Sequence, residues 1–119
     1  MSQKPLAERL QIKKGRRLHI QNAPSGFSVA GADDAPLHTA EVALLFVRDR
    51  ADYEARHLPF RDETRPEAIL WLAYPKLTSP LAGDLNRNLL HDLVQEVGLD
   101  TVAQIAIDAV WSALRLKRL

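Results

Sequence analysis

The stretch AILWLAYPKLTSPLAGDLNRNLLHDLVQEV, residues 68–97, decides the fold. Its first part, Ala68–Tyr74, is continuously apolar, which is typical of a strand with both faces buried. Pro75 ends that strand, and Asp84 is expected to cap a helix over Leu85–Val97, whose apolar residues recur at intervals of three and four. A buried strand, a polar loop and an amphipathic helix make half of a βαβ unit. The loop is therefore expected at the sheet edge where α/β proteins usually bind ligands.

Two further strands are expected upstream. Val42–Val47 is continuously apolar, like Ala68–Tyr74, and is again typical of a strand under helices on both sides. Arg16–Asn22 alternates between apolar and polar residues, and the following Ala-Pro-Ser-Gly breaks it. Phe27–Thr39 is rich in Gly, Ala, Asp and Pro and gives no firm prediction.

Two further helices are expected. Lys4–Lys14 has Pro near its start and Gly directly after its end, which is the usual polarity of a short helix. Asp49 is placed to cap the other helix, predicted over Arg50–His57 and ending before Pro59.

The tail, Thr101–Leu119, fits two patterns. Its apolar residues match a helical period, but Ala103, Ile105 and Ile107 also alternate as they would in a strand. Two short strands joined near Asp108 complete a sheet better than a lone helix does, so we favour the hairpin. The whole chain, residues 1–119, is then expected to be a single α/β Rossmann-like domain with a mostly parallel five-stranded sheet and flanking helices.

Composition narrows the functional classes. The chain has 119 residues, a formal net charge of +1 and no cysteine. That charge gives no overall field for nucleic acid or an anionic membrane, and a thiol nucleophile or a zinc–thiolate site is excluded. The amino-terminal residues are charged rather than apolar, unlike a secretory signal, so we expect a cytoplasmic protein.

Several short motifs of this sequence resemble those of a small bacterial family known as domain of unknown function 3052. They are GRRLHIQNAPSGF, LLFVRDRADYE, ILWLAYPK, DLNR, VGL and IDAVWSALRL, and they cover nearly the whole chain. Many relatives have WPK where this chain has Tyr74-Pro75-Lys76. The resemblance implies no reaction.

More distantly, the carboxyl-terminal strand–helix–hairpin is similar to the second half of class I methyltransferases. That likeness implies strand order 1-2-3-5-4 with the last strand antiparallel. The cofactor motif is missing, because Asn22–Gly26 offers one glycine and a proline where a nucleotide-binding turn needs several glycines. No cofactor is therefore expected.

The residues that follow each strand should meet at one rim of the sheet. We expect an aromatic wall, a lysine and a helix start there, a combination that suits an anionic group. Trp111 is expected beside Tyr74 and Lys76. The candidate ligand-binding residues are Asn22, Tyr74, Lys76, Ser79, Asp84, Asn86, Asp108, Trp111 and Ser112.

The simpler alternative is that these residues have structural roles only. They would then end a strand, cap a helix, shape a turn or, for the tryptophan, fill the core. The histidines have no metal-ligand spacing, so neither a metal nor a catalytic residue is expected. The preferred function is a non-enzymatic binding or regulatory module for an anionic ligand or a protein partner. The alternative is a small enzyme on a degenerate methyltransferase-like fold.

Two surfaces offer further hypotheses. The strand predicted at the sheet edge has Gln104 as its only strongly polar interior residue, so it could pair with a second copy to form a homodimer. Basic residues are expected at the rim opposite the strand-end loops, where they are more often solvated than bound to RNA. They are Lys13, Lys14, Arg16, Arg17, Arg115, Lys117 and Arg118.

Overall fold

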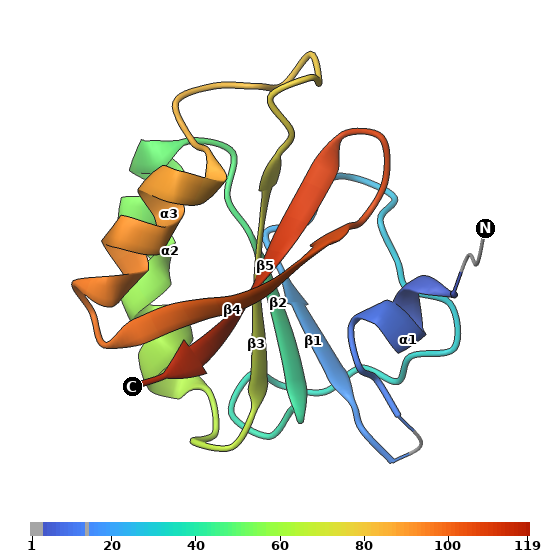
Figure 1. Ribbon diagram of the computed structural model, residues 1–119. Coiled ribbons are helices and arrows are strands. Elements are labelled where there is room, and N and C mark those ends of the chain that lie inside the picture. Colours follow the sequence, from blue (N-terminus) through green and yellow to red (C-terminus); the bar gives the residue numbers. More distant parts are fainter. Residues whose placement is uncertain (1–3, 14) are drawn as a thin grey trace.

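The computed structural model, in which residues 4–13 and 15–119 are described, contains one five-stranded sheet (Figure 1). Its order, β1-β2-β3-β5-β4, is the predicted one. β1, β2 and β3 are parallel, and β5 is antiparallel to both of its neighbours, as expected. The strands are β1 (Leu18–Gln21), β2 (Val42–Phe46), β3 (Ile69–Pro75), β4 (Leu99–Ala106) and β5 (Trp111–Arg118).

In the part of the chain that the structure describes, three helices flank the sheet: α1 (Leu6–Arg9), α2 (Arg50–Glu63) and α3 (Arg87–Gln95). In Figure 1, α2 and α3 lie side by side on one face of the sheet, and α1 lies on the other. The hairpin prediction for the tail is confirmed, since β4 and β5 pair directly. Gly98, with φ of 80°, makes the left-handed turn between α3 and β4 that a residue with a Cβ adopts only with strain.

The helix predicted over Lys4–Lys14 is wrong in length. α1 has only four residues, because the chain turns at Leu10 and then adopts a positive φ of 65° at Gln11. Lys14 lies outside the described residues. The buried Leu10 side chain and its carbonyl both contact the sheet, so tertiary packing ends this helix early.

The prediction that the second helix ends before Pro59 is also wrong, because α2 continues through Pro59 to Glu63. The missing N–H of Pro59 leaves the carbonyl of Ala55 without its helical donor. Both residues are exposed, so water can supply that hydrogen bond. The helix continues because Tyr53 and Phe60, seven residues apart on one face, are both buried against the sheet.

The expected cap of the third helix is corrected by the structure. Asn86, not Asp84, precedes α3, and its side-chain oxygen accepts from the backbone N–H of Leu89 at 2.9 Å. Asp84 instead accepts from the backbone N–H of Arg50 at 2.9 Å, at the start of α2. Its charge therefore favours the positive end of that helix and ties the loop after β3 to α2. Asp49 caps α2 as predicted.

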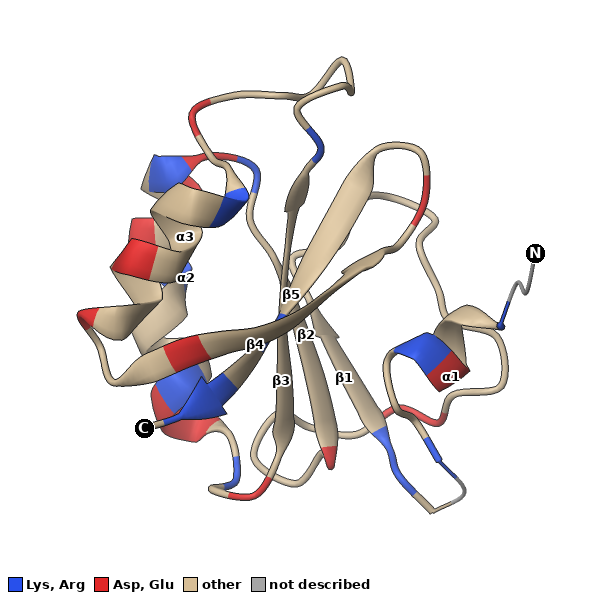
Figure 2. Ribbon diagram, in the orientation of Figure 1, with Lys and Arg blue, Asp and Glu red and all other residues tan. Residues whose placement is uncertain are grey.

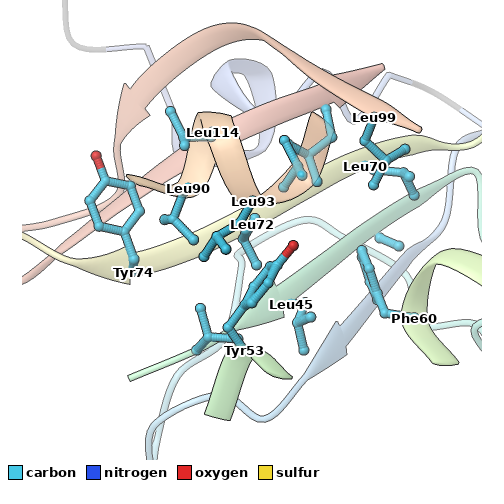
Figure 3. Packing of buried hydrophobic residues seen from close by; sticks show 14 of the residues in the cluster. Leu45, Tyr53, Phe60, Leu70, Leu72, Tyr74, Leu90, Leu93, Leu99 and Leu114 are labelled. Carbon is cyan, nitrogen blue, oxygen red and sulfur yellow. The ribbon is translucent and has the colours of Figure 1, made fainter. Parts of the chain in front are cut away.

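The first core layer lies between the sheet and the helices α2 and α3 (Figure 3). Figure 3 shows Phe60 of α2 and Leu90 and Leu93 of α3 around the strand residues Leu45 and Leu72. The second layer covers the opposite face, and irregular chain takes the place of a second helical layer there. It is formed by α1 and residues 23–40, with Leu10, Phe27 and Val29 packed over strand residues such as Trp71 and Phe46.

Both layers are needed to explain the apolar strands. All five residues of β2 are buried, because alternate side chains enter opposite layers. Trp71 of β3 is 1% exposed, and its indole N–H donates to the carbonyl of Leu10 at 3.0 Å. This bond fixes the amino-terminal segment on the sheet.

Candidate functional site

A crevice is expected between the carboxyl ends of β1 and β2. The connection that leaves β1 packs on one face of the sheet, and α2, which follows β2, packs on the other. Strand ends whose connections diverge in this way are the usual ligand sites of open α/β sheets. At this point of the structure lies Asn22, whose φ is 60°. Its side-chain amide donates to the carbonyl of Phe46 and to the carboxylate of Asp52, both at 2.9 Å.

Asp52 makes further hydrogen bonds at these strand ends. Its carboxylate also accepts from the backbone N–H of Arg48 at 3.0 Å and from the Arg56 guanidinium at 2.6 Å. Partial burial opposes ionisation of this carboxyl, but the hydrogen bonds from Arg56, Arg48 and Asn22 outweigh it and lower its pKa. The polar side chains at the carboxyl ends of β1 and β2 are therefore bonded to one another and to the backbone.

Several other predicted site residues hold the backbone in shape. Asn86 caps α3 and Asp84 binds the start of α2, as described above. Ser79 is buried, and its hydroxyl donates to the carbonyl of Lys76 at 2.8 Å. Asp108 accepts from the N–H groups of Val110 and Trp111, both at 2.8 Å, which shapes the turn of the β4–β5 hairpin. These four side chains therefore serve turns and caps.

The two aromatic residues are neighbours in the sheet but do not form a common wall. Tyr74 pairs with Ser112, and Pro75 pairs with Trp111. Because successive side chains point to opposite faces, Tyr74 enters the layer of α2 and α3, whereas Trp111 enters the other layer. There Trp111 packs edge-on against Phe46 with the ring centroids 5.0 Å apart.

Tyr74 and Ser112 are both buried. The Tyr74 hydroxyl lies 3.0 Å from the side-chain nitrogen of Gln104, which donates to it. Burial raises the pKa of Tyr74, and the charge of Arg87 and the bond with Ser112 only partly oppose this effect. The hydroxyl consequently stays protonated at neutral pH.

The loop from Lys76 to Asp84 is a part of the rim that faces solvent. Lys76 is half-buried, and its backbone N–H donates to the carbonyl of Val110 in the hairpin turn at 2.7 Å. Ser79 and Ala82 close two successive turns, with bonds of 3.0 and 3.1 Å. This bonded loop leaves Leu77 65% exposed and Leu81 50% exposed. An apolar pair beside a lysine is thus presented on an ordered backbone.

A cavity that the sequence did not predict lies along β1. It has a volume of about 460 Å³ and lies between Leu18–Ile20 and the arch formed by residues 27–35. Asp34 and Ala35 return beside Leu18 and narrow it. Its walls come from the segment that gave no firm prediction, so no sequence pattern marked it.

Among residues 4–13 and 15–119, no group of three or more His, Asp or Glu side chains is placed to hold a metal ion. No helix in that part of the chain is long and apolar enough to cross a membrane.

Among the described residues, most of the predicted basic side chains lie at the rim opposite the loop, whereas Arg115 lies within β5. Figure 2 shows Lys and Arg at the amino end of β1, at the lower right, and at the carboxyl end of β5, at the left. Most of these cations are bound within the protein. Arg17 forms an ion pair with Glu41 at 3.1 Å, and Arg118 donates to the Thr64 hydroxyl at 2.6 Å. Arg115 donates to the side chain of Gln11.

The ion pair of Glu41 at this rim should make the free energy of unfolding depend on pH. Hydrogen bonds from Arg17 lower the pKa of Glu41 from 4.5 to about 2. A lowered carboxyl pKa adds stability above the ordinary value, which is lost as the pH falls toward the lowered one. The destabilisation caused by Glu41→Gln should therefore be constant above pH 4.5 and shrink as the pH falls toward about 2. Urea unfolding between pH 2.5 and 7 measures it; an equal cost across the range would contradict the ion-pair account.

Comparisons with known proteins support the fold alone. No protein-family model matches the chain, and no curated protein matches it in sequence. The sequence resemblance to the bacterial family therefore stays a prediction.

Solved structures give a distant likeness. The chain is similar to LepI in complex with SAM (14% identity, TM-score 0.52) and to a LepI variant in complex with SAH and a substrate analogue (14% identity, TM-score 0.51). It is also similar to a structure described as a pericyclic reaction enzyme (15% identity, TM-score 0.50). Each likeness covers 96% of this chain but only 39% of the other protein. The sheet thus resembles part of a methyltransferase-type Rossmann fold.

Proposed function

We propose that this chain is a non-enzymatic binding module, whose loop from Lys76 to Asp84 docks an acidic segment with apolar side chains on a partner protein. The observation that carries the proposal is the exposure of Leu77 and Leu81 on a hydrogen-bonded loop beside Lys76. A backbone that is already held by hydrogen bonds loses little conformational entropy when its exposed apolar side chains bind a partner.

The positive charges near the loop predict that the partner is acidic. Lys76 borders the two leucines, and Arg87 follows the same loop at the start of α3. A carboxylate on the partner can pair with Lys76 while its apolar side chains cover Leu77 and Leu81. The carboxylate of Asp84 does not oppose this pairing strongly, because it already accepts from the start of α2.

The state of the other rim residues favours binding over catalysis. The side chains of Ser79 and Asp108 are bonded to backbone groups, and that of Asn22 is bonded to a backbone carbonyl and to Asp52. Tyr74 is buried with its hydroxyl bonded. An acid–base catalyst needs a titratable group that can reach a substrate. The rim offers the Lys76 ammonium and an apolar surface, which are suited to recognition.

The proposal extends to family and compartment. The words YPK, DLNR and WSALR support membership of the bacterial family known as domain of unknown function 3052, as a divergent member. The absence of cysteine from the sequence supports a cytoplasmic location, where thiols are kept reduced. Expression with a fluorescent tag tests the location, and secretion of the tagged protein would contradict it.

Selection from a displayed peptide library tests the binding site. We expect the selected peptides to be acidic and apolar, and Leu77→Ser/Leu81→Ser to weaken their binding at least about tenfold, since each 1.4 kcal/mol is a factor of ten. Lys76→Ala should weaken binding and reduce its dependence on salt. Fluorescence anisotropy measures both effects.

Two controls make the result specific. Leu119→Ser changes a leucine outside the loop that is more exposed than Leu77 or Leu81, and it should leave binding unchanged. Thermal unfolding of all variants should stay close to that of the parent protein, because the substituted side chains are exposed or half-buried. Peptides that bind the double variant as tightly as the parent would refute the proposed site.

A further inference from the structure

The outer edge of β4 is unusually free of charge. β4 ends the sheet, and the stretch TVAQIAI, which runs from Thr101 in β4 to Ile107 directly after it, contains no charged residue. Ala103, Gln104 and Ala106 are exposed, and Val102 is 48% exposed. Edge strands of this length usually carry charged side chains that prevent pairing with another chain.

The hydrogen bonds of the hairpin show which peptide groups face outward. The N–H of Ile107 donates to the carbonyl of Trp111 at 2.9 Å, so Ile107 faces β5. Alternation then directs Ile105 and Ala103 toward β5, and Ala106 and Gln104 outward. The Arg9 guanidinium donates to the carbonyl of Ala106, which agrees with this assignment. The backbone N–H and C=O of Gln104 therefore face outward together. Gln104 follows the exposed Ala103 directly and lies two residues before Ala106, whose carbonyl is already bound.

Opposite charges border this edge. Asp100 lies at its amino end, where its carboxylate accepts from the Thr101 N–H at 2.9 Å and from the Gln95 side chain at 3.3 Å and stays one-third exposed. Arg9 lies at its carboxyl end through the bond to Ala106. An antiparallel second copy would bring Asp100 of each chain toward Arg9 of the other. A parallel copy would bring like charges together, so electrostatics selects the antiparallel arrangement.

We propose that two copies of this chain pair edge to edge through β4, antiparallel, about a two-fold axis at Gln104. The backbone N–H and C=O of Gln104 then exchange hydrogen bonds with those of its symmetry mate, and the two five-stranded sheets become one. A register shift between Thr101 and Ala103 bends the strand and limits the pairing to a few residues. The dimer is accordingly weak and forms at high protein concentration.

The lack of cysteine provides a clean test by cross-linking. In a hydrogen-bonded antiparallel pair, the Cα atoms of opposite residues are about 5.5 Å apart, which suits a disulfide. Gln104→Cys should therefore form a disulfide-linked dimer at least about tenfold faster than Lys117→Cys, because pairing raises its effective concentration. Lys117 is the matched control, since it is exposed on the neighbouring strand β5. Equal rates for the two variants would overturn the proposal.

Charge reversal gives a second test that does not touch Gln104. Sedimentation equilibrium of the parent protein should show a monomer–dimer equilibrium. Asp100→Arg should shift it to monomer, and Arg9→Glu/Asp100→Arg should restore the dimer. Circular dichroism confirms that each variant is folded. A parent protein that stays monomeric at millimolar concentration, or a double variant that fails to recover while folded, would refute this pairing.

Discussion

Trp71→Ala should cost about 4 kcal/mol in the free energy of unfolding, as truncation of fully buried aromatic residues typically does. Trp71 is 1% exposed and lies at the centre of the second core layer. Its indole also donates to Leu10, so truncation leaves that carbonyl without its donor. Since domains of this size have a stability of roughly 5–15 kcal/mol, such a loss takes a large share of it.

Trp71→Phe separates packing from hydrogen bonding. It keeps most of the ring volume but orphans the carbonyl of Leu10, for an expected cost of about 1–3 kcal/mol. Urea unfolding followed by circular dichroism measures both variants. A cost below about 1 kcal/mol for Trp71→Ala would contradict the docking of the amino-terminal segment on the sheet.

Pro59→Ala should stabilise the protein by about 1–2 kcal/mol. Proline costs about 3 kcal/mol in a helix interior, and its restriction of the unfolded chain returns about 1 kcal/mol. Pro59 is exposed within α2, so alanine there restores a helical N–H without loss of packing.

The matched control is Pro66→Ala. Pro66 is exposed in the connector between α2 and β3, where no helical hydrogen bond can be gained. It should be neutral or slightly destabilising. Thermal unfolding of the two variants distinguishes them, and a destabilised Pro59→Ala would contradict a continuous α2.

Much of the fold could be predicted because its signals are local. Val42–Val47 and Ala68–Tyr74 are apolar on every residue, and both faces of the sheet are covered where they lie. Helix ends were harder to predict. α2 passes Pro59 because burial of Phe60 outweighs one lost hydrogen bond, and α1 stops early because Leu10 contacts Trp71. Contacts distant in sequence decide both boundaries.

The candidate site was predictable in position but not in detail. The strand ends do meet at one rim, and the backbone of Lys76 bonds to the hairpin turn near Trp111. The sequence could not show that Asn22 and Asp52, thirty residues apart, bond to each other and close the crevice. Nor did it mark Leu77 and Leu81 as exposed, because apolar residues in a loop can equally be buried.

Chemical-shift mapping tests the central claim most directly. The ¹⁵N-labelled protein is titrated with S-adenosylmethionine in one arm and with a selected acidic peptide in the other. We predict that the peptide shifts the amides from Lys76 to Asp84 and that S-adenosylmethionine at millimolar concentration leaves Asn22–Gly26 unmoved. Saturable shifts at Asn22–Gly26 with S-adenosylmethionine, and none around Lys76 with the peptide, would contradict the account.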